Sequence, residues 1–213
     1  MSQFFAVHPD NPEPRLIKRA VAIIRDGGVI AYPTDSCYAL GCHIGDKDAM
    51  DRIRRIRGVD ERHHFTLVCR DLSEIGQYAK VDNVQYRLLK AHTPGSYTFI
   101  LRATRELPRR LAHPKRSTIG VRVPLHPVTH ALLAELKEPL LSSTLMLPDD
   151  IVPLNDPEQI RKRLEHALDL IIDGGPCGIQ PTTVIDLSEG DPILVRAGKG
   201  DLAHFGFEVL AKE

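Results

Sequence analysis

A chain of 213 residues and 23.8 kDa is long enough to bury a substantial core as a single domain. Hydrophobic residues make up 42% and charged residues 26%, and the mean hydropathy of -0.18 excludes an integral membrane protein. The start of the chain lacks the basic residues and apolar run of a signal peptide, and no stretch reaches the ~18 apolar residues that span a bilayer. We therefore expect a cytoplasmic protein with no membrane partner.

The 28 basic and 28 acidic residues cancel overall but are unevenly distributed. Seven arginines and lysines lie from Arg102 to Arg122, opposed only by Glu106, which predicts a basic surface. The four cysteines form no Cys-x-x-Cys pair, so we interpret them as buried small apolar groups.

The chain begins with a predicted helix followed by a predicted strand. Apolar residues recur at helical spacing from Leu16 to Ile24, and the pattern stops at Gly27-Gly28, where glycine suits the left-handed conformation that ends a helix. The apolar run of residues 29–32 ends at Pro33, which is typical of a buried strand. A second helix is predicted over residues 46–57, ended by Gly58.

Helices and strands continue to alternate along the rest of the chain. We predict helices at residues 82–92, 127–136 and 157–166, and strands at 65–69, 97–103, 118–123, 140–144, 168–172, 183–187 and 193–196. This order predicts an α/β fold without internal repeats, in one domain over residues 1–213 with its core at about 14–200.

Polar side chains follow the first predicted strand. Thr34, Asp35, Ser36 and Tyr38 occupy the place where open α/β sheets bind ligands, and they could orient a small polar substrate. A capped turn, in which Asp35 and Ser36 bond backbone N–H groups, explains the same residues equally well. The motif by itself leaves both interpretations open.

Further segments accompany this motif in a fixed order along the chain. They are Thr-Pro-Gly-Ser-Tyr-Thr-Phe-Ile-Leu at 93–101, Thr-Ile-Gly-Val-Arg-Val-Pro at 118–124, Pro-Thr-Thr-Val-Ile-Asp at 181–186 and Ile-Leu-Val-Arg at 193–196. Each segment is weak alone, but together they resemble the YrdC/YciO family across most of the chain. The resemblance implies an α/β fold with a twisted, open, mixed sheet, surrounding helices and a large basic concave cavity.

The resemblance also implies an activity and its ligands. The family joins L-threonine, bicarbonate and ATP, with Mg²⁺ on the ATP, into threonylcarbamoyl-adenylate, and it releases pyrophosphate in a step that serves tRNA modification. Such a nucleotidyltransferase needs no protein nucleophile, because the carbamate attacks the α-phosphorus. The protein positions the two ligands and neutralises phosphate charge.

Residue roles follow from the same resemblance, position by position. Arg55 and Arg57 would act as catalytic residues by neutralising the leaving pyrophosphate. Thr34, Ser36 and Tyr38 would face the threonine. The nucleotide would be held by Thr118, Arg122, Ser142, Thr144 and Arg196.

Two motifs depart from the pattern of the synthases. A Lys-x-Arg-Pro stretch is replaced by Arg55-Ile-Arg57-Gly58, and a Ser-x-Asn stretch by Thr144-Leu-Met146, whose thioether cannot replace the hydrogen bonds of an amide. With Ser36 and His63-His64, these changes are similar to the YciO branch. The histidines show no metal-ligand spacing, so we predict surface or core histidines and no structural metal.

Two other functions remain open on the sequence alone. The first is a non-catalytic or weakly catalytic protein of the YciO branch that binds double-stranded RNA or tRNA through its basic residues, with contact candidates Arg102, Arg105, Arg109, Arg110, Lys115 and Arg116. The second is a cavity that serves another nucleotide or a phosphorylated metabolite, with the basic residues merely solvated.

Overall fold

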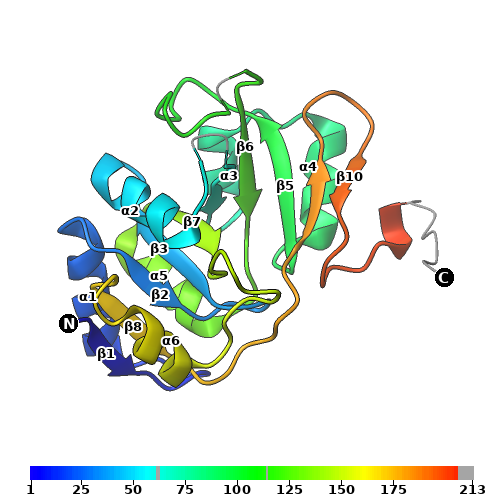
Figure 1. The fold of residues 1–213 in the computed structure, drawn as a ribbon. Helices are drawn as coiled ribbons and strands as arrows, with labels where there is room; N and C mark the ends of the chain where they lie inside the picture. Colours follow the sequence, from blue (N-terminus) through cyan, green and yellow to red (C-terminus); the bar gives the residue numbers. More distant parts are fainter. Residues whose placement is uncertain (61–62, 114, 206–213) are drawn as a thin grey trace.

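The computed structural model describes residues 1–60, 63–113 and 115–205. Their strands form one sheet of 10 strands in the order β1-β8-β2-β3-β7-β4-β6-β5-β9-β10, with helices packed around it (Figure 1). The sheet is mixed, because β4 pairs parallel to β6 whereas β5 pairs antiparallel to β6. It is open, because the edge strands β1 and β10 do not pair with each other. The α/β fold with an open mixed sheet is therefore confirmed.

The elements have the following bounds. The strands are β1 (Gln3–Ala6), β2 (Ile30–Tyr32), β3 (Ala39–His43), β4 (Thr66–Val68), β5 (Tyr97–Arg102), β6 (Thr118–Arg122), β7 (Leu140–Thr144), β8 (Leu170–Asp173), β9 (Thr183–Asp186) and β10 (Ile193–Arg196). The helices are α1 (Pro14–Arg25), α2 (Lys47–Arg57), α3 (Leu72–Tyr78), α4 (Asn83–His92), α5 (Pro127–Leu136) and α6 (Pro157–Leu164), followed by a short 3₁₀ turn (Ala203–Phe205). No helix in the described part of the chain is long and apolar enough to cross a membrane.

Every predicted helix and strand is present, and both predicted helix ends at glycine are confirmed. Gly27, after α1, has φ +85°, and Gly58, directly after α2, has φ +61°. The sequence analysis missed β1, β3 and α3. The strand β3 is buried on both faces and therefore shows no alternation, and α3 has only seven residues.

The helices leave one part of the sheet uncovered. One core packs α1 and α5 against strands that include β1, β2 and β8, and the other packs α2, α3, α4 and α6 against the strands from β2 to β9. Figure 1 shows α3 and α4 behind β6 and β5, on one side of these strands. The apolar side chains of β5 and β6 that point to this side are Phe99, Leu101, Ile119 and Val121. Side chains alternate along a strand, so the residues between them point to the face without helices.

The cysteines were predicted to be buried small apolar groups. Cys37, Cys42 and Cys69 are buried, whereas Cys177 is only half-buried, because it lies in the irregular segment after β8 rather than in a strand. The prediction is therefore confirmed for three of the four and wrong for the fourth.

Candidate functional site

A cavity of about 620 Å³ lies on the helix-free face of the sheet. Its floor consists of residues from β3, β7, β4, β6, β5, β9 and β10, and these residues alternate along β4, β5, β6 and β9. At the centre of the floor is Gly120, where a Cβ atom would lie only 3.1 Å from the Thr66 Oγ1 atom and 3.3 Å from the Phe65 carbonyl oxygen. Glycine at this position keeps the floor of the cavity free of a side chain.

Four arginines from distant parts of the chain line this cavity. Arg57 is the last residue of α2, Arg122 ends β6, Arg196 ends β10, and Arg116 lies just before β6. Among the described lining residues, Asp186 is the one acid, and its Oδ2 atom lies 3.9 Å from the Arg116 Nη1 atom. A cavity with such an excess of positive charge is suited to an anionic ligand.

Arg57 is positioned by the end of α2. Gly58 has left-handed backbone geometry and stops the helix, and any Cβ atom there would lie 2.5 Å from the Pro148 Cγ atom. The Arg57 Nη1 atom donates a hydrogen bond of 2.5 Å to the Thr144 carbonyl oxygen at the end of β7. The helix end and β7 together hold this guanidinium against the cavity.

Arg122 is positioned by a buried ion pair. Its Nη2 atom donates to the Asp35 carboxylate, and the two side chains are only 8% and 10% exposed. The other carboxylate oxygen of Asp35 accepts a 2.6 Å hydrogen bond from the Ser96 hydroxyl, just before β5. Asp35 thus fixes the orientation of Arg122 from outside the cavity lining.

Arg196 is positioned by the segment that precedes β9. Its Nε and Nη2 atoms donate to the Thr182 carbonyl oxygen at 3.2 and 2.9 Å. The Thr182 hydroxyl lies 2.9 Å from the Thr98 hydroxyl on β5. Two neighbouring strands therefore support the guanidinium at the outer side of the cavity.

These guanidinium groups are packed close to one another. Burial lowers the pKa of Arg57 below its ordinary value, and the charge of Arg196 lowers it further. Burial also lowers the pKa of Arg196, with a further contribution from Arg122. Arginine remains protonated even so. A bound anion would remove this repulsion and replace the hydration that the guanidinium groups have lost.

Three lining residues carry a buried polar atom without a partner in the described part of the chain. These atoms are Arg57 Nε, Arg122 Nε and Thr118 Oγ1. A buried donor without a partner costs free energy, so such groups in a native protein usually meet water or a ligand. The phosphate oxygens of a ligand are acceptors that would satisfy them.

The residues predicted to bind a nucleotide come together in this cavity. Thr118, Arg122, Ser142, Thr144 and Arg196 all line it. The Ser142 hydroxyl is already engaged, however, because it donates to the Leu40 carbonyl oxygen at 3.0 Å and lies 2.7 Å from the Tyr32 hydroxyl. These nucleotide contacts stay predictions.

The residues predicted to face threonine lie outside the lining of this cavity. The Thr34 hydroxyl donates to the Cys37 carbonyl oxygen at 2.6 Å and lies 3.1 Å from the Ser36 hydroxyl. The Tyr38 hydroxyl donates to the Gly175 carbonyl oxygen at 2.9 Å. All three side chains are buried, and the hydrogen bonds of the Thr34 hydroxyl lie within the loop itself. The capped turn forms around Thr34, whose hydroxyl accepts from the Ser36 and Cys37 N–H groups, and not around Asp35 and Ser36 as that interpretation had it. The threonine contacts stay predictions.

The other predicted basic residues are mostly outside the cavity. Arg55 is exposed on α2 and does not line it, although its neighbour Arg57 does. Arg110 donates to the Gly45 carbonyl oxygen. Of the candidates for RNA contact, only Arg116 lines the cavity, while those on the exposed surface include Arg105, Arg109 and Lys115. RNA binding stays a prediction.

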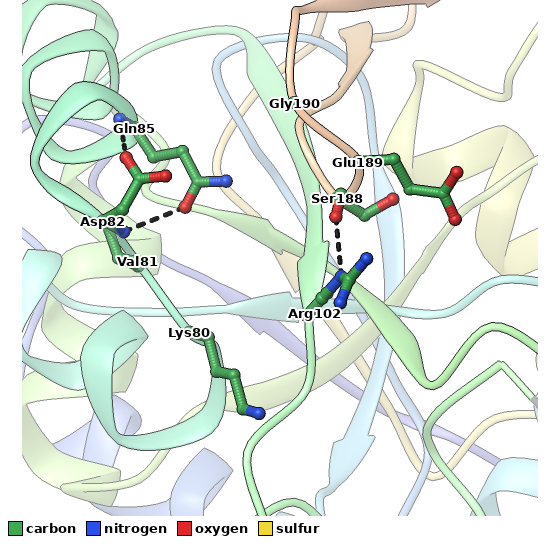
Figure 2. Close-up of a pocket in the computed structure, with 8 residues that line it drawn as sticks. All are labelled: Lys80, Val81, Asp82, Gln85, Arg102, Ser188, Glu189 and Gly190. Carbon is green, nitrogen blue, oxygen red and sulfur yellow. Dashed lines mark hydrogen bonds between the residues drawn. The ribbon is translucent and has the colours of Figure 1, made fainter.

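A second, more open pocket of about 680 Å³ lies between the start of α4 and the turn after β9. Figure 2 shows its two basic side chains, Lys80 and Arg102, and the hydrogen bond of 2.8 Å from Arg102 Nε to the Ser188 carbonyl oxygen. Asp82 and Gln85 cap α4 in this view. Apart from Arg102, the pocket contains no predicted site residue, so we take the arginine-lined cavity as the candidate site.

The sequence analysis did not predict that His63 belongs to the cavity lining. Its Nε2 atom lies 2.9 Å from the Ser143 hydroxyl on β7, and its ring meets the edge of the Phe65 ring at a centroid distance of 5.5 Å. The pKa of His63 is lowered to about 4, first by burial and then by the charge of Arg57. The imidazole is therefore neutral near pH 7.

This pKa predicts a pH-dependent loss of stability. Between about pH 6.5 and pH 4 the unfolded chain binds a proton at His63 that the folded chain excludes, so the free energy of unfolding falls as the pH is lowered through this window. We expect His63→Gln to lose less stability than the wild type between pH 7 and pH 4.5 in urea unfolding. His166→Gln, at an exposed position, serves as the control, and equal losses in the wild type and His63→Gln would contradict the prediction.

No group of three or more His, Cys, Asp or Glu side chains that could hold a metal occurs in residues 1–60, 63–113 and 115–205. Asp186 is a single carboxylate and already accepts from the Ser188 N–H at 2.8 Å.

The sequence matches a known protein family. The family model for Sua5, YciO and YrdC, described as "Telomere recombination", matches residues 22–198. This match spans most of the chain. The chain belongs to the Sua5/YciO/YrdC family.

Some relatives in the Sua5/YciO/YrdC family have names that state an activity, and others do not. YciO of Escherichia coli K12 is 60% identical over 96% of this chain and 100% of that protein, and its crystal structure superposes with a TM-score of 0.93. A threonylcarbamoyl-AMP synthase of Halorhodospira halophila is 29% identical over 85% of this chain and 95% of that protein. P. abyssi Sua5, in a crystal structure with L-threonine, is 26% identical with a TM-score of 0.85, over 92% of this chain and 58% of that one.

Proposed function

We propose that the arginine-lined cavity binds ATP and that the protein makes threonylcarbamoyl-adenylate from ATP, L-threonine and bicarbonate. The observation that carries this proposal is the convergence of Arg57, Arg122 and Arg196 on one cavity, with unpartnered Nε atoms on the first two. The relatedness to proteins named threonylcarbamoyl-AMP synthase, and to Sua5 solved with L-threonine, supports the choice of substrates.

The chemistry requires little of the protein beyond position and charge. The carboxylate oxygen of the carbamate attacks the α-phosphorus, the bond from this phosphorus to the bridging oxygen breaks, and pyrophosphate leaves with the electron pair. Arg57 and Arg196 would stabilise the charge that develops on the leaving group, and Arg122 would orient the α-phosphate. Magnesium, when bound with ATP, would neutralise further phosphate charge.

Cys37, although it lines the cavity, is not suited to covalent catalysis. Burial raises the pKa of its thiol, so the thiol remains protonated and is a poor nucleophile at neutral pH. The proposed reaction agrees with this, because it uses no covalent intermediate with the protein.

Met146 is the departure that bears most directly on activity. It lines the cavity two residues after Thr144, where the synthases have an asparagine whose amide can hydrogen-bond to a ligand. One neutral hydrogen bond contributes about 0.5–1.5 kcal/mol, which corresponds to roughly tenfold in rate or affinity. The change is therefore expected to weaken the activity and not to remove it.

The test is pyrophosphate release from ATP by the purified protein. We expect release that depends on both threonine and bicarbonate, and about a tenfold faster release by Met146→Asn, since the amide restores a hydrogen bond. Each substrate is omitted in turn as a control. ATP that binds without release of pyrophosphate, in the wild type and in Met146→Asn alike, would contradict the synthase proposal and leave a nucleotide-binding protein.

A further inference from the structure

His63 occupies a position in the cavity that the proposed adenylation step does not use. It lies on the segment between α2 and β4, and its Nε2 atom is within hydrogen-bond distance of Ser143 on β7. The aromatic edge of Phe65 packs against the same ring. The side chain is thus held in one orientation at the cavity wall, as a group that takes part in chemistry must be.

The charges around His63 depend on whether an anion is bound. Arg54 and Arg57 face it from α2, and His64 and Asp60 face it from its own segment. Burial, together with the excess of positive over negative charge in this set, keeps the imidazole neutral. A bound polyanion at Arg57 would reverse the local field, so the proton affinity of the ring would rise when the nucleotide enters.

The proposed reaction needs such a proton acceptor. An α-amino group is largely an ammonium ion near neutral pH, and it must lose a proton before its nitrogen can attack carbon. The proton passes to the base while the N–H electron pair stays on nitrogen. The free amine then adds to bicarbonate, and one water leaves, which gives the carbamate.

The other lining groups are less suited to this role. Arginine does not lose its proton in proteins, and the buried Cys37 thiol keeps its own. The Asp186 carboxylate accepts from the Ser188 N–H and faces Arg116. The His64 ring stacks on the His113 ring at a centroid distance of 4.5 Å. The hydrogen bond to Ser143 on β7 is made by His63.

We propose that His63 is the general base of this cavity, which accepts the proton of the substrate ammonium once the anionic nucleotide is bound. The assignment rests on the proposed function. The Ser143 hydroxyl, 2.9 Å from the His63 Nε2 atom, holds the imidazole in place at the cavity wall. A base of this kind contributes about 10²–10⁴-fold to the rate.

The first experiment measures catalysis in His63→Gln, whose amide can still bond to Ser143 but cannot accept a proton in this pH range. We expect a loss of at least about 100-fold in threonine-dependent pyrophosphate release at pH 7, with ATP affinity within a few-fold of the wild type. The loss should shrink at alkaline pH, where the ammonium of the free amino acid loses its proton to the solvent. The control is His166→Gln, an exposed histidine remote from the cavity, which should match the wild type. A His63→Gln protein with the rate and pH profile of the wild type would overturn the assignment.

The second experiment separates this assignment from the proposed function. The heat of pyrophosphate binding is measured at pH 6 in two buffers of different ionisation enthalpy, which reports protons taken up on binding. We expect the wild type to take up more protons than His63→Gln, and equal uptake would overturn the assignment whatever the activity. If the wild type shows His63-dependent uptake but no pyrophosphate release, the proposed synthase fails while His63 stands as the proton acceptor of a different anion-dependent reaction.

Discussion

Replacing Arg122 with methionine is expected to lower the free energy of unfolding by about 3–5 kcal/mol, because it leaves the Asp35 carboxylate buried without its counter-ion. Both side chains are almost fully buried, so water cannot replace the lost partner. The remaining hydrogen bond from Ser96 satisfies only one carboxylate oxygen. Chemical denaturation of the wild type and Arg122→Met at pH 7 measures the difference.

The double variant Asp35→Asn/Arg122→Met is the control for this interpretation. It removes both charges, and replacement of a whole buried pair is often neutral, so we expect most of the stability to return. On the proposed function, nucleotide binding should be weakened in both variants, because both lack the Arg122 guanidinium. A double variant as unstable as Arg122→Met alone would show that the pair acts through packing and not through charge.

Replacing Arg57 with methionine is expected to weaken ATP or pyrophosphate binding by about 100- to 1,000-fold, because a desolvated guanidinium that meets phosphate contributes several kcal/mol. The same replacement should change the free energy of unfolding by about 1 kcal/mol or less. The lost hydrogen bond to Thr144 is offset by relief of the unfavourable burial and of the repulsion from Arg196. Isothermal titration calorimetry with each ligand measures the affinities.

Arg55→Met is the matched control, since it removes the same charge from the same helix two residues away. Arg55 is exposed and does not line the cavity, so we expect an affinity within about threefold of the wild type at physiological salt. Equal losses in Arg55→Met and Arg57→Met would mean that the two variants weaken a general electrostatic attraction. The specific phosphate contact of Arg57 would then be contradicted.

The helix α2 is an example of a helix that local signals at both ends predicted. The helix α2 begins at Asp46, whose side chain accepts from the Ala49 N–H, and it ends at Gly58. In the strand β3, by contrast, every residue from Ala39 to Cys42 is buried, and one of its two pairing partners, β7, comes from a distant part of the sequence. No local pattern marks such a strand, because its position depends on the rest of the sheet.

In the candidate site, too, some features could be predicted from the sequence and others depend on the fold. The resemblance to the YrdC/YciO family pointed to Arg57, Arg122 and Arg196, and the fold brings all three to one cavity. It also pointed to Tyr38, whose hydroxyl donates to the Gly175 carbonyl oxygen, a contact that no sequence pattern indicated. The role of Asp35 as the partner of Arg122 depends on a contact between residues 87 positions apart, so spacing alone could not reveal it.

The sequence by itself determined the order of helices and strands, the ends of α1 and α2, and the family to which the chain belongs, because these depend on local periodicity, on glycine geometry and on motif order. Only the tertiary structure decided which charged side chains share a cavity. Arg55 and Arg57 are nearly identical in sequence context, but α2 turns one toward solvent and the other toward β7. The physical reason is that a helix rotates about 100° per residue, so its packing against the sheet, and not its composition, selects the residue that faces the ligand.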